Sequence, residues 1–162
     1  MSSFYDELST VTADNVKKPE QLPPGFYLLT VTEAKLINVD DQGAPLENKN
    51  VGWEYTFRVL RPLNESTVEA LRAANIENLD KRELRHSFWI TPDALYRHKD
   101  FCRLCGVDTT GRPYRELFRA PVGHMVSAEL HKEVGRKNNK TQTDEEGQPI
   151  YYTRVKSFAP AA

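Results

Sequence analysis

Residues 84–106 read LRHSFWITPDALYRHKDFCRLCG, and they join a strand pattern directly to a helix pattern. The side chains of the first seven residues alternate between two faces, which is typical of a half-buried strand; one face carries Leu84, His86, Phe88 and Ile90. Thr91, Pro92 and Asp93 follow in the order of N-cap, first helical position and acidic first turn. Gly106 is a typical residue just beyond a helix C-terminus. The stretch therefore predicts a strand followed at once by a helix.

Two more strands are predicted before this stretch and two after it. In chain order they cover about residues 26–39, 53–59, 122–134 and 150–158. In the second of them, Trp53, Tyr55 and Phe57 alternate with polar residues, so we expect these three rings in the core. A long polar hairpin loop, 135–149, is expected between the last two strands.

A short helix is expected in the insertion at residues 61–83, before the third strand. Ser66 and Glu69 have the spacing of a capping box, which predicts a helix over 66–75. The order of elements is then three strands with this insertion, a helix, and two strands.

An OB-fold has this order, because its five-stranded barrel carries a helix between strands three and four. Other α+β folds share the order. The sequence thus predicts a mainly β chain with an OB-type barrel over 22–158. An N-terminal arm, 1–21, precedes the barrel, and a frayed C-terminus, 159–162, follows it.

The composition is that of an ordinary soluble protein. Of 162 residues, 39% are hydrophobic and 28% are charged, and no apolar stretch approaches the ~20 residues that span a bilayer. The polar N-terminus has no signal-peptide pattern. Two cysteines three positions apart cannot form a secreted disulfide framework. We therefore expect a cytoplasmic protein with no membrane association.

The charge is unevenly distributed along the chain, although the net charge is only −1. Residues 1–80 hold 7 Lys and Arg against 13 Asp and Glu, whereas residues 81–162 hold 15 against 10. This asymmetry is compatible with a basic face built from the second half. Charge also fluctuates along any chain by chance, so the pattern is a weak indication of nucleic-acid binding.

Four ordered motifs resemble a family of bacteriophage-encoded single-stranded DNA-binding proteins and a related phage family of unknown function. The motifs are LPPGFY at 22–27, WEYTFRV at 53–59, FCRLCGVD at 101–108 and YYTRVKSF at 151–158. The resemblance implies an OB-fold and a role in phage DNA replication or recombination, in the cytoplasm of the host cell. The chain departs from the family in the shorter spacing at Leu104-Cys105-Gly106 and in the lack of an acidic C-terminal tail, which puts tail-mediated recruitment of partners in doubt.

Binding of single-stranded DNA requires cations for the phosphates and aromatic faces for the bases. The outward positions of the strands at 84–90 and 150–158 offer both, if Val155, Thr153 and Tyr151 point inward. The loop after the fourth strand adds flexible basic residues. The predicted binding residues are Arg85, Trp89, Lys132, Arg136, Lys137, Lys140, Tyr152, Arg154 and Lys156. The alternatives are that Trp89 packs under a helix or the 61–83 insertion, and that Asp144, Glu145 and Glu146 neutralise the loop.

A zinc site is a less favoured alternative. His98, Cys102 and Cys105 have i, i+4 and i+7 spacing on one helix, with His86, His124 or His131 as a fourth ligand. Structural zinc sites usually draw on two separate ligand pairs, however, and no second cysteine pair exists. Buried free cysteines are common in cores. We therefore expect no metal and no cofactor.

No enzyme motif is found in the sequence. The leading hypothesis is a non-enzymatic protein that binds single-stranded DNA largely independently of sequence. Its partners would include phage replication or recombination proteins, and a homo-oligomer is compatible with the sequence. The alternative is an OB-like protein–protein interaction adaptor in phage replication or virion assembly. A small zinc-dependent enzyme is the third option.

Overall fold

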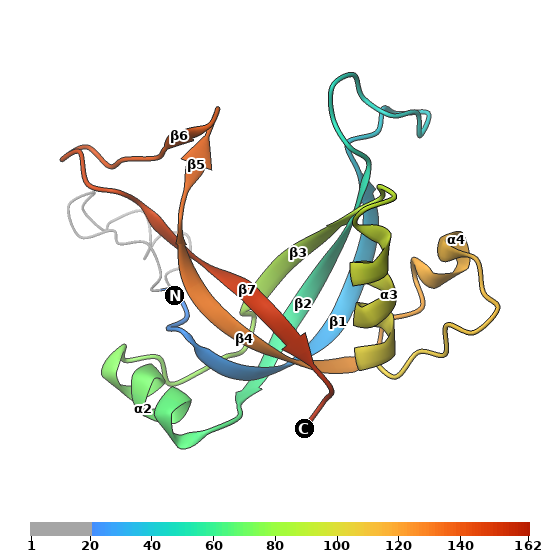
Figure 1. Ribbon diagram of the computed structural model, residues 1–162. Coiled ribbons are helices and arrows are strands. Elements are labelled where there is room, and N and C mark those ends of the chain that lie inside the picture. The colour runs from blue at the N-terminus through green and yellow to red at the C-terminus, as the bar shows by residue number, and fades with distance from the viewer. Residues whose placement is uncertain (1–20) are drawn as a thin grey trace, which may run out of the picture.

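The computed structural model describes residues 21–162, and its main element is one antiparallel sheet of five strands (Figure 1). The strands are β1 (Gly25–Ile37), β2 (Gly52–Pro62), β3 (Glu83–Trp89), β4 (Met125–Val134) and β7 (Tyr151–Ala159). They lie in the order β3-β2-β1-β4-β7. The prediction of a mainly β chain with these five strands is confirmed. The predicted N-terminal arm lies, except for Gln21, outside the described residues.

Three helices accompany the sheet: α2 (Glu65–Ala73), α3 (Leu95–Leu104) and α4 (Tyr114–Leu117). Within residues 21–162, no helix is long and apolar enough to cross a bilayer. The helix in the insertion begins slightly earlier than predicted, because Asn64 caps it instead of Ser66. Asn64 Oδ1 accepts a hydrogen bond from the amide of Thr67 at 2.9 Å. The expected capping box is therefore wrong.

The helix after β3 also differs from its prediction at the N-terminus. Thr91 does not cap it; residues 91–94 form a turn in which the amides of Ala94 and Leu95 both donate to the Thr91 carbonyl at 3.0 Å. The helix proper starts at Leu95 and has no side-chain cap. The predicted stop is confirmed, since Gly106 has a φ of 84° just beyond the C-terminus.

The core lies on the inner face of the curled sheet. Tyr55 and Phe57 are fully buried there and Trp53 is nearly so, as the alternation predicts. The helix α3 contributes Phe101, whose ring centroid lies 5.1 Å from that of Tyr55. Because α3 contacts both β3 and β7, it covers the side of the core where the two edges of the sheet approach each other.

The two edge strands meet through side chains. The ring of Phe158 in β7 lies 5.2 Å from the ring of His86 and 6.2 Å from that of Phe88, both in β3. Within the described part of the chain, no backbone pairing joins β3 to β7. The expected barrel is therefore present only as a curled sheet, without hydrogen-bonded closure.

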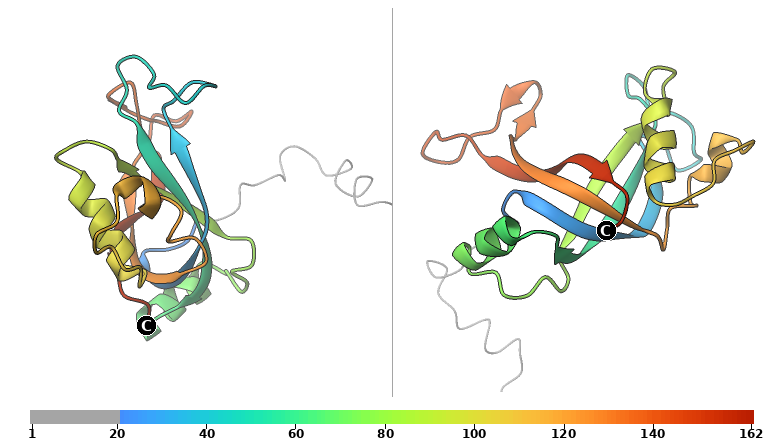
Figure 2. Two further views of the ribbon diagram at one scale, coloured as in Figure 1. Left: turned by 90° about the vertical axis from the view of Figure 1, so that its right-hand side faces the viewer. Right: turned by 60° about the horizontal axis from the view of Figure 1, so that its bottom comes forward.

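A small hairpin replaces the loop expected at 135–149. It consists of β5 (Arg136–Lys137) and β6 (Lys140–Thr141), joined by Asn138 and Asn139 with φ of 53° and 62°. Two consecutive positive φ values define the turn that best matches strand twist, and asparagine tolerates them. Figure 1 shows this hairpin and the β1–β2 loop both at the top of the view, the hairpin on the left and the loop on the right, and Figure 2 gives two further views of both. They follow opposite ends of the strands, because the start of β1 pairs with the second half of β4, which leads into the hairpin.

Candidate nucleic-acid interface

Trp89 is the most exposed of the predicted aromatic binding residues. It ends β3 and pairs with Gly52 across the sheet. Its indole lies over this glycine: a β-carbon on Gly52 would stand 2.9 Å from Cε3 of the indole and 3.1 Å from Cγ1 of Ile37. The side chain is 42% exposed, so it is not packed under a helix or under the insertion. The six-membered ring is thus held close to the backbone of β2, while much of the side chain is open to solvent.

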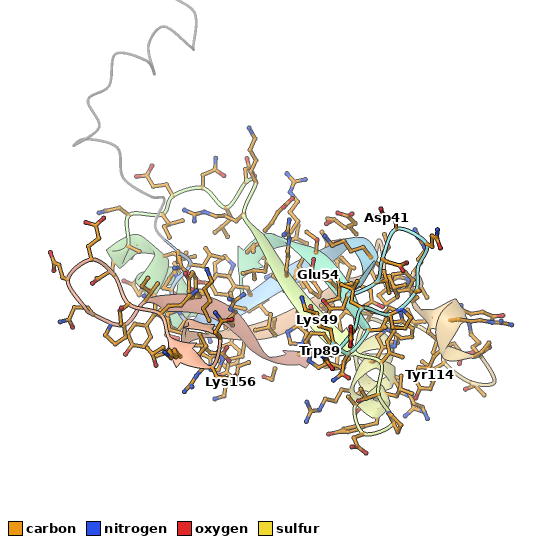
Figure 3. The ribbon with its side chains drawn as sticks, turned by 90° about the horizontal axis from the view of Figure 1, so that it is seen from above. Asp41, Lys49, Glu54, Trp89, Tyr114 and Lys156 are labelled. Atoms are coloured by element: carbon orange, nitrogen blue, oxygen red, sulfur yellow. The ribbon has the colours of Figure 1, made fainter. Side chains whose placement is uncertain are left out.

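The β1–β2 loop brings polar groups to this indole. Asn38, Lys49 and Asn50 line a shallow pocket of about 380 Å³ together with Trp89. The side-chain Nδ2 of Asn38 donates to the backbone carbonyl of Asn50 at 2.8 Å and so joins the two ends of the loop. Figure 3 shows Lys49 beside Trp89. The site thus combines an aromatic surface, a cation and amide groups, which are the groups that recognise a base with its phosphate.

Tyr152 is supported in the same way at the base of the β5–β6 hairpin. Its ring lies against Gly135, where a β-carbon would overlap Cε2 of the ring. The guanidinium of Arg154 lies 5.3 Å from the ring centroid, a cation–π distance. Tyr151 lies on the same face as Thr153 and Val155, as predicted, because the pairing with β4 is regular over these residues. It is nevertheless 50% exposed, while Thr153 and Val155 are buried, because the core ends at Thr153.

The hairpin concentrates positive charge at its tip. Lys137 and Lys140 are direct partners across the two-residue turn, and Arg136 precedes them. Like charges at paired positions destabilise a hairpin unless an anion lies between them. Within residues 21–162, none of these three cations has an ion pair with a carboxylate. Asp144 instead accepts hydrogen bonds from the amides of Glu146 and Gln148 in its own turn, so it does not neutralise the tip.

The remaining predicted cations are more dispersed. Arg85 is exposed on β3, and Lys132 lies on β4 opposite Thr153, on the face that carries Leu130. Lys132 is thus a residue of the strand predicted at 122–134 and does not belong to the flexible hairpin. Lys156 sits at a register shift between β4 and β7, and its Nζ lies 3.7 Å from Glu129. In Figure 3 it lies apart from Trp89 and Lys49.

The residues of the alternative zinc site form a hydrogen-bonded cluster. The hydroxyl of Tyr55 donates to the Phe118 carbonyl at 2.7 Å, and His98 Nε2 lies 2.6 Å from that hydroxyl oxygen. Since the phenol donates its one proton to Phe118, Nε2 must donate its own to the phenol oxygen, so the neutral imidazole is the Nε2-protonated tautomer. Cys102 Sγ lies 3.7 Å from Nε2, a weak hydrogen-bond contact to sulfur. Within the described residues, no three His, Cys, Asp or Glu side chains are placed to hold a metal.

Burial sets the ionisation of this cluster. It lowers the pKa of His98 to about 4 and raises the pKa of Cys102 to about 11 and that of Cys105 to about 12. All three groups are therefore neutral at physiological pH. A neutral thiol is a poor nucleophile, so the cysteines serve packing in this environment.

Sequence reasoning missed Gly52, Gly135, Lys49 and the two asparagines at the ends of the β1–β2 loop. A glycine at a strand end indicates that a neighbouring group approaches the backbone closely, and this signal could have identified Gly52 and Gly135. The neighbour itself depends on strand register and could not be identified from spacing.

No model of a known protein family matches this chain, and a comparison with curated protein sequences gives no match. The resemblance to phage single-stranded DNA-binding proteins therefore rests on the ordered motifs alone and stays a prediction.

Proposed function

We propose that this chain is an OB-type domain that binds single-stranded DNA largely independently of sequence and catalyses no reaction. The strand order β3-β2-β1-β4-β7, with α3 between the third and fourth long strands, supports the fold. In OB-folds, the loop between the first two strands and the loop between the last two flank the ligand. Here these are the β1–β2 loop and the β5–β6 hairpin.

One observation carries the proposal. At the base of each projecting loop, an aromatic side chain rests on a glycine with a cation beside it: Trp89 on Gly52 with Lys49, and Tyr152 on Gly135 with Arg154. A ring held in place against backbone is pre-organised for stacking, which contributes ~1–3 kcal/mol per base. The unpaired hairpin cations would then contact the phosphates.

The proposal is tested by titrating labelled oligo-dT and a duplex of equal length at two salt concentrations. We expect tight binding of the single strand at low salt, weaker binding of the duplex, and a steep loss with salt because phosphate contacts release counterions. Equal affinity for both forms, or no mobility shift at low salt, would refute the proposal. The same proposal places the protein in the cytoplasm, with replication or recombination proteins as partners.

A second candidate function is a protein–protein interaction adaptor. The net charge of −1 favours it, and so does exposed apolar surface on the outer side of β1 and β4. Phe26 is 45% exposed and Met125 is 49% exposed there. This adaptor would be indifferent to DNA in the same titration and would retain a protein partner when the charge of the hairpin is removed.

A further inference from the structure

A pocket of about 350 Å³ lies between β3, α3 and β7, away from the two loops. It occupies the seam where the edge strands approach without backbone pairing. Because no hydrogen-bond ladder crosses this seam, only side chains separate the pocket from the core. The volume is at the lower end of the range for small-molecule sites, ~300–1,000 Å³, which suits one small ligand.

Aromatic rings form the floor of this pocket. Phe158 lies nearly perpendicular to His86, at 84° and 5.2 Å between centroids, and is tilted by 31° to Phe88 at 6.2 Å. Burial lowers the pKa of His86, so its imidazole is neutral at physiological pH and offers one donor and one acceptor. The floor is therefore suited to a planar ring that carries hydrogen-bonding groups.

Charged side chains form the rim. Arg97 and Lys156 bring two cations, and Asp100 brings one carboxylate. Arg97 uses Nε to donate to Tyr96 Oη at 3.2 Å, which leaves its two terminal nitrogens available. Lys156 is held only loosely by Glu129, at 3.7 Å. The rim thus favours an anionic group attached to the ring below.

We propose that this pocket binds a single nucleotide, with its base against Phe88 and Phe158 and its phosphate near Arg97 and Lys156. The inference rests on the proposed function where the nucleotide belongs to a bound strand, which would place one unstacked base in the seam. A free mononucleotide offers the same chemistry. The seam is a second site, separate from the platforms of Trp89 and Tyr152.

The test is a titration of the whole chain followed by amide chemical shifts, with dTMP, deoxyribose 5-phosphate, N-acetyltryptophanamide and oligo-dT as probes. We expect dTMP or oligo-dT to shift the signals of residues 86, 97 and 158, and the sugar phosphate to leave them unchanged. Shifts from dTMP alone identify a free nucleotide as the ligand. Shifts from oligo-dT alone identify a base of the strand.

Two variants alter the pocket by different means. Leu104→Trp fills it from α3, and Arg97→Glu reverses a rim charge on the surface. Both should lower the affinity of the pocket for its ligand by about tenfold, the scale of one lost charge-assisted hydrogen bond. Arg103→Glu, on the same helix but outside the pocket, is the matched control and should change affinity less than about twofold.

The proposal is overturned if neither dTMP nor oligo-dT shifts these signals, or if N-acetyltryptophanamide shifts them more strongly than either. It is also overturned if both variants bind like the control. If single-stranded DNA binding fails but the pocket proposal holds, oligo-dT would not bind at all, whereas dTMP would still shift the pocket signals.

Discussion

The indole of Trp89 lies on Gly52 so closely that a β-carbon on the glycine would stand 2.9 Å from Cε3. The backbone of β2 thereby holds the ring at the base of the β1–β2 loop. The missing side chain of Gly52 is therefore what allows the indole of Trp89 to occupy this position.

Gly52→Ala should displace the indole and weaken oligo-dT binding by about 1–3 kcal/mol, as much as Trp89→Ala, because either change removes one stacking platform. Fluorescence anisotropy with labelled oligo-dT measures the loss. Gly25→Ala is a suitable control, since its β-carbon would meet Thr67 at 2.5 Å, at the end of β1 opposite to the β1–β2 loop. Equal loss of binding in both variants would indicate a general folding defect and contradict this role of Trp89.

The opposed lysines of the hairpin predict the salt dependence of binding. If Lys137 and Lys140 each neutralise a phosphate, Lys137→Gln with Lys140→Gln should reduce the slope of log K against log salt by about 1.4, from ~0.7 per contact on a single strand. Anisotropy at several salt concentrations gives the slope. Arg112→Gln with Arg115→Gln, near α4, should leave it unchanged. An unaltered slope in the hairpin variant would exclude the phosphate contacts.

Buried His98 predicts a loss of stability in acid. Its folded pKa, about 4, lies below the unfolded value of about 6.5, so below pH 6.5 the unfolded chain binds a proton that the folded chain does not. Stability is complete above pH 6.5 and falls as the pH drops toward 4, by up to about 3 kcal/mol from this group. His86, whose pKa burial also lowers, adds to the same trend.

Urea unfolding between pH 4 and 7 measures this effect. His98→Gln should be less stable at pH 7, because the buried hydroxyl of Tyr55 loses part of its hydrogen bonding, but its stability should depend less on pH. His124→Gln, at an exposed site, should retain the wild-type dependence. A wild-type stability that does not change over this range would contradict the neutral buried imidazole.

Gln21 predicts a local effect at the edge of β7. Its Nε2 donates to the Tyr151 carbonyl at 3.0 Å, and its Oε1 accepts from the amide of Thr153 at 2.7 Å, so the side chain acts like a neighbouring strand. Gln21→Ala should cost about 1–2 kcal/mol and speed hydrogen exchange at Thr153. Gln21→Glu keeps the acceptor and should protect Thr153 more than alanine does. Equal exchange in all three proteins would show that the contact is absent in solution.

The strands were predictable from sequence because alternation depends only on a two-residue period. Tyr55 and Phe57 are buried, and Trp89 faces away from the core, as that period requires. The helix starts were less predictable, since several residues compete for the same amides. Asn64 caps the helix two residues before Ser66, and the turn at 91–94 closes before the helix begins.

The remaining features depend on tertiary approach. The hairpin at Asn138-Asn139 could have been inferred from its two asparagines, but the opposition of Lys137 and Lys140 follows from its register. The seam pocket depends on how Phe158 of β7 meets β3, seventy residues earlier in the chain, and no local pattern encodes that distance. For the same reason the glycine supports of Trp89 and Tyr152 were not predicted.

The most direct test of the account is the tryptophan fluorescence of the wild-type protein during titration with oligo-dT at low salt. Of the two tryptophans, Trp53 is 5% exposed and Trp89 is 42% exposed, so the change should come from Trp89. We predict strong quenching that high salt reverses, and none in Trp89→Phe although that variant still binds. Binding of oligo-dT without any quenching of the wild type, or no binding at all, would contradict the proposed interface.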